Sequence, residues 1–268
     1  MNRQSFSIVV DFEATGIEPT KARPIEVGLC LVDSSTWAPV CATHRVIFEQ
    51  DYASLQQEII DITGITQDEL FTGISLVRAL AEFQDKIGDK LPQVDYVVAY
   101  NRDYDEVLYR TEADRVLCGL TPLGKLMLDL PWICAMRDVE ENYKHKCWKL
   151  AHLALDHGVA VDPANLHRAM ADVELTMKLL SRVGTTAEKM HTFQKVPWVA
   201  MQALIPAPFQ DGGKGRDLAV KAGYSWQKAR GSDRVFEKAW VKLVKEHLVE
   251  KELSSVPFKA RQIGGVNG

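Results

Sequence analysis

Long apolar runs, paired cysteines and internal repeats are all missing from this 268-residue sequence. No apolar run approaches the ~20 residues of a membrane-spanning helix, and the first residues contain no apolar core of a signal peptide. The five cysteines form no C-x-x-C pair, which argues against a zinc site or a disulfide framework and indicates reduced, buried thiols. With 46% hydrophobic and 25% charged residues, the composition excludes a disordered or fibrous protein. We expect a cytoplasmic globular protein.

Charge is distributed unevenly along the chain. Residues 195–268 contain 13 Lys+Arg and 7 Asp+Glu, a net charge of +6, so the preceding residues carry −10 of the total of −4. Prolines and a Gly-Gly pair near residue 212 indicate a linker. We therefore expect a main domain over residues 1–190, a linker over 191–212 and a small basic α+β module over 213–268. A basic module indicates either a polyanionic partner or a solvated basic surface.

The pattern of apolar residues predicts an α/β fold with a mixed sheet, because three successive strands are followed by strands that alternate with helices. In the main domain we expect strands at 7–13, 25–32, 40–48, 94–100 and 126–130, and helices at 54–61, 75–87, 104–117, 132–140, 149–156 and 169–181. In the module we expect a helix at 217–222, strands at 224–226 and 235–240, and a helix at 241–251.

Two carboxylates stand close together on the first predicted strand. Side chains alternate along a strand, so Asp11 and Glu13 lie side by side on one face. The apolar run that precedes Asp11 is typical of a central strand, where such a pair repels itself and has raised pKa values unless a cation lies between the two groups. A metal site and a solvated strand face are both consistent with the pair considered alone.

Two further groups of chemically active residues follow. Asp103, Asp105 and Glu106 come where the fourth strand leads into a helix, and each could simply interact with the helix dipole. His167 precedes Asp172 by five residues, about 140° of helical rotation, so both can reach one site only if His167 leaves the helix. A histidine in a loop suits a general base, although an ordinary surface histidine is the alternative.

These three groups together resemble the three motifs of the DEDD exonucleases. The motifs are Asp11-Phe12-Glu13-Ala14-Thr15-Gly16, Tyr100-Asn101-Arg102-Asp103-Tyr104-Asp105 and His167-x-Ala169-x-x-Asp172. His167 is typical of the DEDDh branch, since the tyrosine branch has Tyr at the position of Arg168. The resemblance covers roughly residues 6–183, and the segments 131–136 and 167–169 are most similar to exonuclease X and its phage relatives.

The resemblance implies an RNase H-like fold and a metal-dependent 3′→5′ exonuclease that releases nucleoside 5′-monophosphates from single-stranded nucleic acid, with DNA expected. It implies that Asp11, Glu13, Asp105 and Asp172 bind two Mg²⁺ or Mn²⁺ ions, and that His167 is the general base. The residues that it implies for the terminal nucleotide are Thr15, Gly16, Ile17, Ile62 and Asn101, with a core position as the alternative for Ile62. An RNA-trimming enzyme, a non-catalytic binding module and a phosphoesterase for small nucleotides remain open.

The basic module offers candidates for holding a nucleic-acid strand. Its candidate phosphate-binding residues are Lys214, Arg216, Lys228, Arg230 and Arg234. The aromatic residues that could stack on bases are Tyr224, Trp226, Phe236 and Trp240. The alternative, which we favour, is that these aromatics form the core of the module itself, and docking to another protein is a further possible role.

Overall fold

The computed structural model describes residues 3–49, 54–116, 119–145, 147–163, 166–230 and 235–266. The chain divides into two compact units, Met1–Gln194 and Lys195–Gly268. Among the described residues, no helix has the length and apolar character required to cross a membrane.

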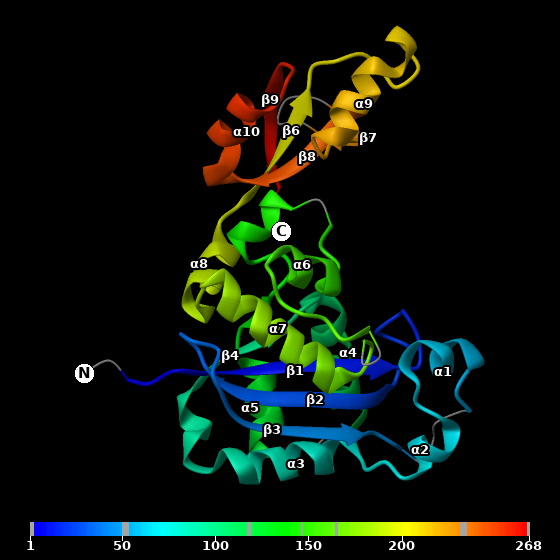
Figure 1. Ribbon diagram of the computed structural model, residues 1–268, viewed down its shortest axis with the longest axis vertical. Helices are drawn as coiled ribbons and strands as arrows, with labels where there is room; N and C mark the ends of the chain where they lie inside the picture. The colour runs from blue at the N-terminus through cyan, green and yellow to red at the C-terminus, as the bar shows by residue number, and fades with distance from the viewer. Residues whose placement is uncertain are drawn as a thin grey trace. The chain divides into compact units, whose positions relative to one another are not determined.

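A five-stranded mixed sheet forms the centre of the first unit (Figure 1). Its strands are β1 (Phe6–Ala14), β2 (Pro24–Asp33), β3 (Pro39–Val46), β4 (Val94–Ala99) and β5 (Trp132–Cys134), in the order β3-β2-β1-β4-β5. β1 is antiparallel to β2 and parallel to β4, so the predicted central position of β1 is confirmed. Its side chains are buried up to Val10, and Asp11 and Glu13 are the partly exposed residues near its end.

Helices cover both faces of this sheet. α3 (Leu76–Ile87), α4 (Arg102–Val116) and α5 (Pro122–Asp129) share a core with Ile8, Val10 and Phe12 of β1. α7 (Ala169–Val183) packs on the opposite face with Val9, and Figure 1 shows it crossing β1 and β2. The remaining helices are α1 (Gln57–Thr63), α2 (Gln67–Phe71), α6 (Leu150–Asp156) and α8 (Ala187–Lys195). This arrangement confirms the α/β, RNase H-like fold.

Two predicted elements of the first unit are wrong. Residues 126–130, predicted as a strand, belong largely to α5, because Thr121 caps that helix by accepting a hydrogen bond from the Gly124 N–H and Pro122 occupies its first turn. None of residues 132–140, predicted as a helix, is α-helical: the first three form β5, which pairs with β4, and residues 135–137 form a turn. So short a strand carries no periodicity, and its conformation depends on its neighbour in the sheet.

The second unit contains a four-stranded antiparallel sheet in the order β7-β8-β6-β9. Its elements are β6 (Trp198–Ala203), α9 (Lys214–Lys221), β7 (Ser225–Arg230), β8 (Val235–Lys245), α10 (Val249–Ser255) and β9 (Ala260–Val266). The predicted linker 191–212 is therefore wrong over residues 198–203, which form a central strand. The predicted helix at 241–251 begins only at Val249, because residues 241–245 continue β8.

The aromatic residues of this unit lie mainly in its core. Tyr224 and Trp240 are buried, Trp226 is half-buried against Trp240, and Tyr224 contacts Phe258 edge-on. Stacking on bases is therefore wrong for the two buried rings. Among the basic candidates, Lys214 and Arg216 are exposed on α9. The side chains of Lys228, Arg230 and Phe236, and the whole of Arg234, lie outside the described part of the chain.

Candidate metal centre and active site

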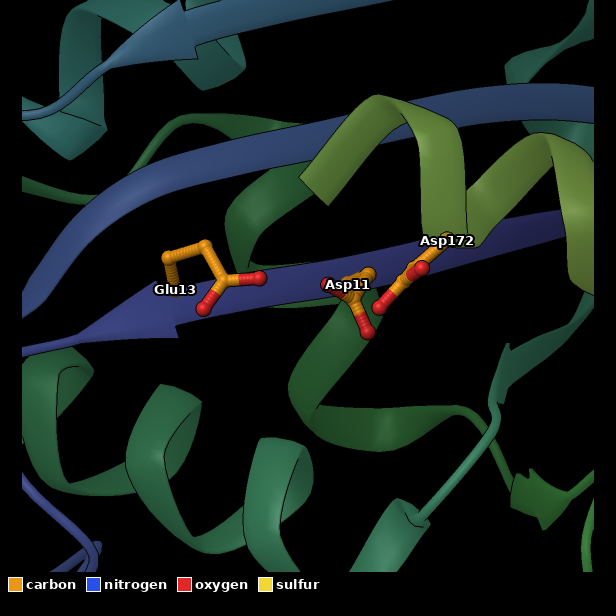
Figure 2. Close-up of side chains that lie close together, drawn as sticks. All are labelled: Asp11, Glu13 and Asp172. Carbon is orange, nitrogen blue, oxygen red and sulfur yellow. The ribbon is translucent and has the colours of Figure 1, made fainter. Parts of the chain in front are cut away.

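Three carboxylates from two distant segments converge at the end of β1. Asp11 and Glu13 project from one face of the strand, and Asp172 extends toward Asp11 from the first turn of α7 (Figure 2). One oxygen of each carboxylate lies within 4.8 Å of an oxygen of both others. All three side chains are half-buried, so the cluster remains open to solvent while much of its hydration is lost.

Asp105 lies beside this cluster but is not one of the three converging groups. It is buried in the first turn of α4, and its Oδ1 accepts a hydrogen bond of 3.2 Å from the backbone N–H of Phe12 on β1. That contact places Asp105 against the strand segment between Asp11 and Glu13. The structure thus brings Asp11, Glu13 and Asp172 together and positions Asp105 next to them.

The electrostatics of the cluster favour a cation. Burial raises the pKa of Asp11 well above its usual value, and the negative charges of Asp105, Glu13 and Asp172 raise it further. Burial and the neighbouring carboxylates raise the pKa of Glu13 to about 8, and burial is the main cause that raises the pKa of Asp105 to about 7. The three converging carboxylates offer hard oxygen ligands, which fit a divalent cation.

His167 lies in the turn before α7, outside the helix, which is the condition under which it and Asp172 can reach one site. Its backbone adopts a left-handed conformation with φ 62°, and its side chain is exposed. Burial raises the pKa of Asp172, and the nearby imidazole of His167 opposes this shift when it is protonated. His167 is therefore close enough to the carboxylates to interact with one of them electrostatically.

The segment after β1 carries three of the residues predicted to contact a nucleotide. The Thr15 hydroxyl accepts a hydrogen bond of 2.9 Å from the Arg23 N–H, and the Tyr104 hydroxyl donates to the carbonyl of Gly16. Ile17 is 95% exposed and therefore contributes little to the core. Because α4 carries both Tyr104 and Asp105, one helix holds this segment and one of the carboxylates.

The two remaining candidates lie on other elements. Ile62 is half exposed in the last turn of α1, so the core alternative for this residue is wrong. Asn101 is exposed where β4 passes into α4. Both side chains are accessible to a ligand.

A buried anchor for α7 escaped the sequence analysis. Glu26 lies opposite Glu13 in the register of β1 and β2, and its carboxylate accepts a hydrogen bond of 2.7 Å from the Ala169 N–H at the start of α7. Arg168 itself provides no side-chain cap, so Glu26 satisfies this free N–H. Gly28 lies opposite Asp11, and a Cβ there would be 2.7 Å from the Ala169 backbone. The available signal was a charged residue, with a glycine two positions later, within an apolar strand.

Comparison with known proteins identifies the family to which the chain belongs. Residues 8–180 match the family described as Exonuclease (RNase_T). Among curated proteins, the PolC-type DNA polymerase III of Thermotoga maritima is 25% identical over 183 residues, which are 68% of this chain. The match covers only 12% of the length of that polymerase.

Solved structures show the same fold. The nuclease domain of 3′hExo, a DEDDh family member bound to rAMP, has a TM-score of 0.54 and 19% identity, covering 67% of this chain and 91% of that domain. E. coli exonuclease I in complex with a dA16 oligonucleotide has a TM-score of 0.61 and 16% identity, covering 96% of this chain and 68% of the exonuclease I chain. Exonuclease X in complex with 5′ overhanging duplex DNA has a TM-score of 0.51 and 18% identity, covering 70% of this chain and 98% of the exonuclease X chain. The chain belongs to the exonuclease family, and its resemblance to the DEDDh exonucleases is confirmed.

Proposed function

We propose that the protein is a metal-dependent 3′→5′ exonuclease that hydrolyses single-stranded nucleic acid, with DNA as the expected substrate, to nucleoside 5′-monophosphates. The observation that carries the proposal is the convergence of Asp11, Glu13 and Asp172. Burial, and then their mutual negative charge, raise the pKa values of Asp11 and Glu13. A bound cation would offset that negative charge and let an anionic phosphodiester approach.

Asp11, Glu13, Asp105 and Asp172 are the residues that would hold two Mg²⁺ or Mn²⁺ ions. When bound there, divalent ions would supply activation of the attacking water and stabilisation of the leaving 3′-oxygen. Asp105 keeps one oxygen engaged with the Phe12 N–H, which fixes the direction of its carboxylate. These side chains therefore orient the scissile phosphate at the end of β1.

His167 is the proposed general base. An exposed imidazole in the turn before α7 can accept a proton from the attacking water at a ring nitrogen. Asp172 lies on the first turn of the helix that follows, so a protonated imidazole would be stabilised by a nearby negative charge.

The terminal nucleotide is proposed to bind between the segment after β1 and the end of α1. Ile17 and Ile62 are exposed apolar residues on these two segments and can press against the base. Thr15 and Gly16 offer backbone groups whose positions are fixed by Arg23 and Tyr104, and Asn101 offers an amide. This arrangement supports recognition of a chain end with its base unstacked.

The test is degradation of matched 5′-labelled DNA and RNA 20-mers and a dinucleotide, with Mg²⁺ and with EDTA. We expect stepwise shortening from the 3′ end only with Mg²⁺, loss of activity in Asp11→Asn, and loss of most turnover in His167→Ala with metal affinity retained. Activity in EDTA, or undiminished activity in Asp11→Asn, would contradict the proposal. Faster cleavage of RNA would favour the RNA-trimming alternative, and activity confined to the dinucleotide would favour a small-nucleotide phosphoesterase.

A further inference from the structure

The guanidinium of Arg168 connects three elements around the site. Its Nε donates to Glu26 Oε1 on β2 at 2.8 Å, and its Nη2 lies 3.0 Å from Glu69 Oε1 on α2. Arg168 directly follows His167 and precedes the first residue of α7. One side chain therefore joins the turn that carries the histidine to the sheet and to the neighbouring helix α2.

The Glu26 end of this connection is rigid. The Glu26 side chain is fully buried, and its carboxylate also accepts hydrogen bonds from the Ala169 N–H and pairs with His44 on β3. A buried carboxylate with several hydrogen bonds cannot move without losing them, and each loss is costly. Glu26 therefore fixes one end of the Arg168 side chain relative to the central sheet.

The Glu69 end leads to the segment that carries Ile62. Glu69 belongs to α2, whose first turn is capped by Thr66, and only residues 64 and 65 separate Thr66 from the end of α1. Ile65 between the two helices is fully buried against Ile25, next to Glu26 on β2. The exposed Ile62 and the exposed His167 are thus joined through Glu69 and Arg168.

We propose that Arg168 is a positioning residue that holds the His167 turn at a fixed distance from the α1–α2 segment, so that the histidine is aligned with a nucleotide bound against Ile62. The inference rests on the proposed nuclease function. Arg168 touches neither substrate nor reacting atoms in this role, and it acts through His167. Because a 1 Å misplacement of a catalytic group can reduce turnover about 100-fold, a flexible turn would lower kcat more than it weakens binding.

The sharpest test removes only the α2 end of the connection. Glu69→Gln keeps the side chain's size but loses its charge, and Asp68→Asn, at an exposed neighbouring position on α2, is the matched control. We expect Glu69→Gln to lower kcat about 10-fold with KM changed less than 3-fold, and Asp68→Asn to behave as wild type. Arg168→Lys, which keeps the charge but cannot reach both carboxylates in the same fork geometry, should show a similar loss.

Two combinations separate positioning from a general structural role. The double variant Glu69→Gln/Arg168→Lys should lose no more activity than Arg168→Lys alone, because both changes break the same contact. In a His167→Ala background, Glu69→Gln should have no further effect on kcat. Mn²⁺ affinity, measured by titration calorimetry, should remain within 3-fold of wild type in all of these variants.

Unchanged kcat in both Glu69→Gln and Arg168→Lys would overturn the inference. An active wild-type protein would leave the nuclease proposal standing in that case. A further loss from Glu69→Gln in the His167→Ala background would overturn it as well, because the effect would then bypass the histidine. An inactive wild type that binds Mn²⁺ would instead contradict the proposed function.

Discussion

Gly28 permits the close approach of α7 to the sheet, and the position of Asp172 depends on that approach. A Cβ at residue 28 would lie 2.7 Å from the carbonyl carbon and oxygen of Ala169 and 2.8 Å from the N of Met170. All three are backbone atoms, so no side-chain rotation relieves the clash. Ordinary contact begins at 3.4 Å, so the helix start must shift by about 0.7 Å. Asp172 lies three residues after Ala169 and shifts with this turn.

The expected cost of Gly28→Ala follows from that displacement. Overpacking of this kind destabilises a protein by about 1–3 kcal/mol. A shift of about 0.7 Å at one of three converging carboxylates should lower kcat on the order of 10- to 100-fold, by comparison with the 100-fold cost of a 1 Å misplacement. Mn²⁺ affinity should fall as well, because Asp172 would no longer meet Asp11 and Glu13 at the present spacing.

The assay is single-turnover hydrolysis of a 5′-labelled 20-mer, together with Mn²⁺ titration calorimetry and thermal unfolding. Gly119→Ala is the control, since a Cβ at residue 119 meets no atom within 4 Å and no left-handed conformation is required there. The activity is measured well below the lowest unfolding temperature. Wild-type turnover and metal affinity in Gly28→Ala would refute the claim that this contact sets the position of Asp172.

Three further predictions concern pH, a buried ion cluster and the basic module. Folding raises carboxyl pKa values in the cluster, that of Glu13 to about 8, so the metal-free protein binds more protons than the unfolded chain and should lose stability as pH rises from about 4.5 to 8. Added Mn²⁺ should stabilise the protein more at pH 8 than at pH 6, and a melting temperature in EDTA that increases over this pH range would contradict the prediction. Glu112 is fully buried and accepts hydrogen bonds from Arg23 and Arg115, so Glu112→Ala should lower the free energy of unfolding, measured in urea, by about 3–5 kcal/mol. A loss below about 1 kcal/mol would be inconsistent with a buried ion pair. Replacing Lys214 and Arg216 by Gln should weaken 20-mer binding and reduce its salt dependence if α9 contacts phosphates, while an unchanged salt slope would point to another role for the module.

The strands and long helices with strong periodicity could be predicted from the sequence. β1, β2, β4, α3, α4 and α7 lie close to their expected ranges. The three strands are short, mostly buried apolar runs, and the three helices bury residues at helical spacing. α2, α8 and β5 could not be found in this way. Their conformations depend on a helix cap or on pairing with a neighbouring strand, and both lie outside the periodic signal.

The candidate site was predictable where neighbouring residues carry the information. The spacing of Asp11 and Glu13 on a strand is sufficient to place both on one face. Helical geometry shows that His167 and Asp172 can share a site only if His167 lies outside the helix. The anchors of the site were not predictable, because Glu26 and Arg168 are 142 residues apart and their contact exists only after folding. A single buried Glu in an apolar strand gives no indication of its partner.

Anomalous diffraction from a crystal soaked in Mn²⁺ tests the central claim most directly. The account predicts anomalous peaks within coordination distance of the carboxylate oxygens of Asp11, Glu13 and Asp172, with Asp105 beside the same ions. In Asp11→Asn crystals soaked in the same way, these peaks should weaken or disappear. A wild-type map with no peak among these carboxylates would contradict a metal-dependent nuclease.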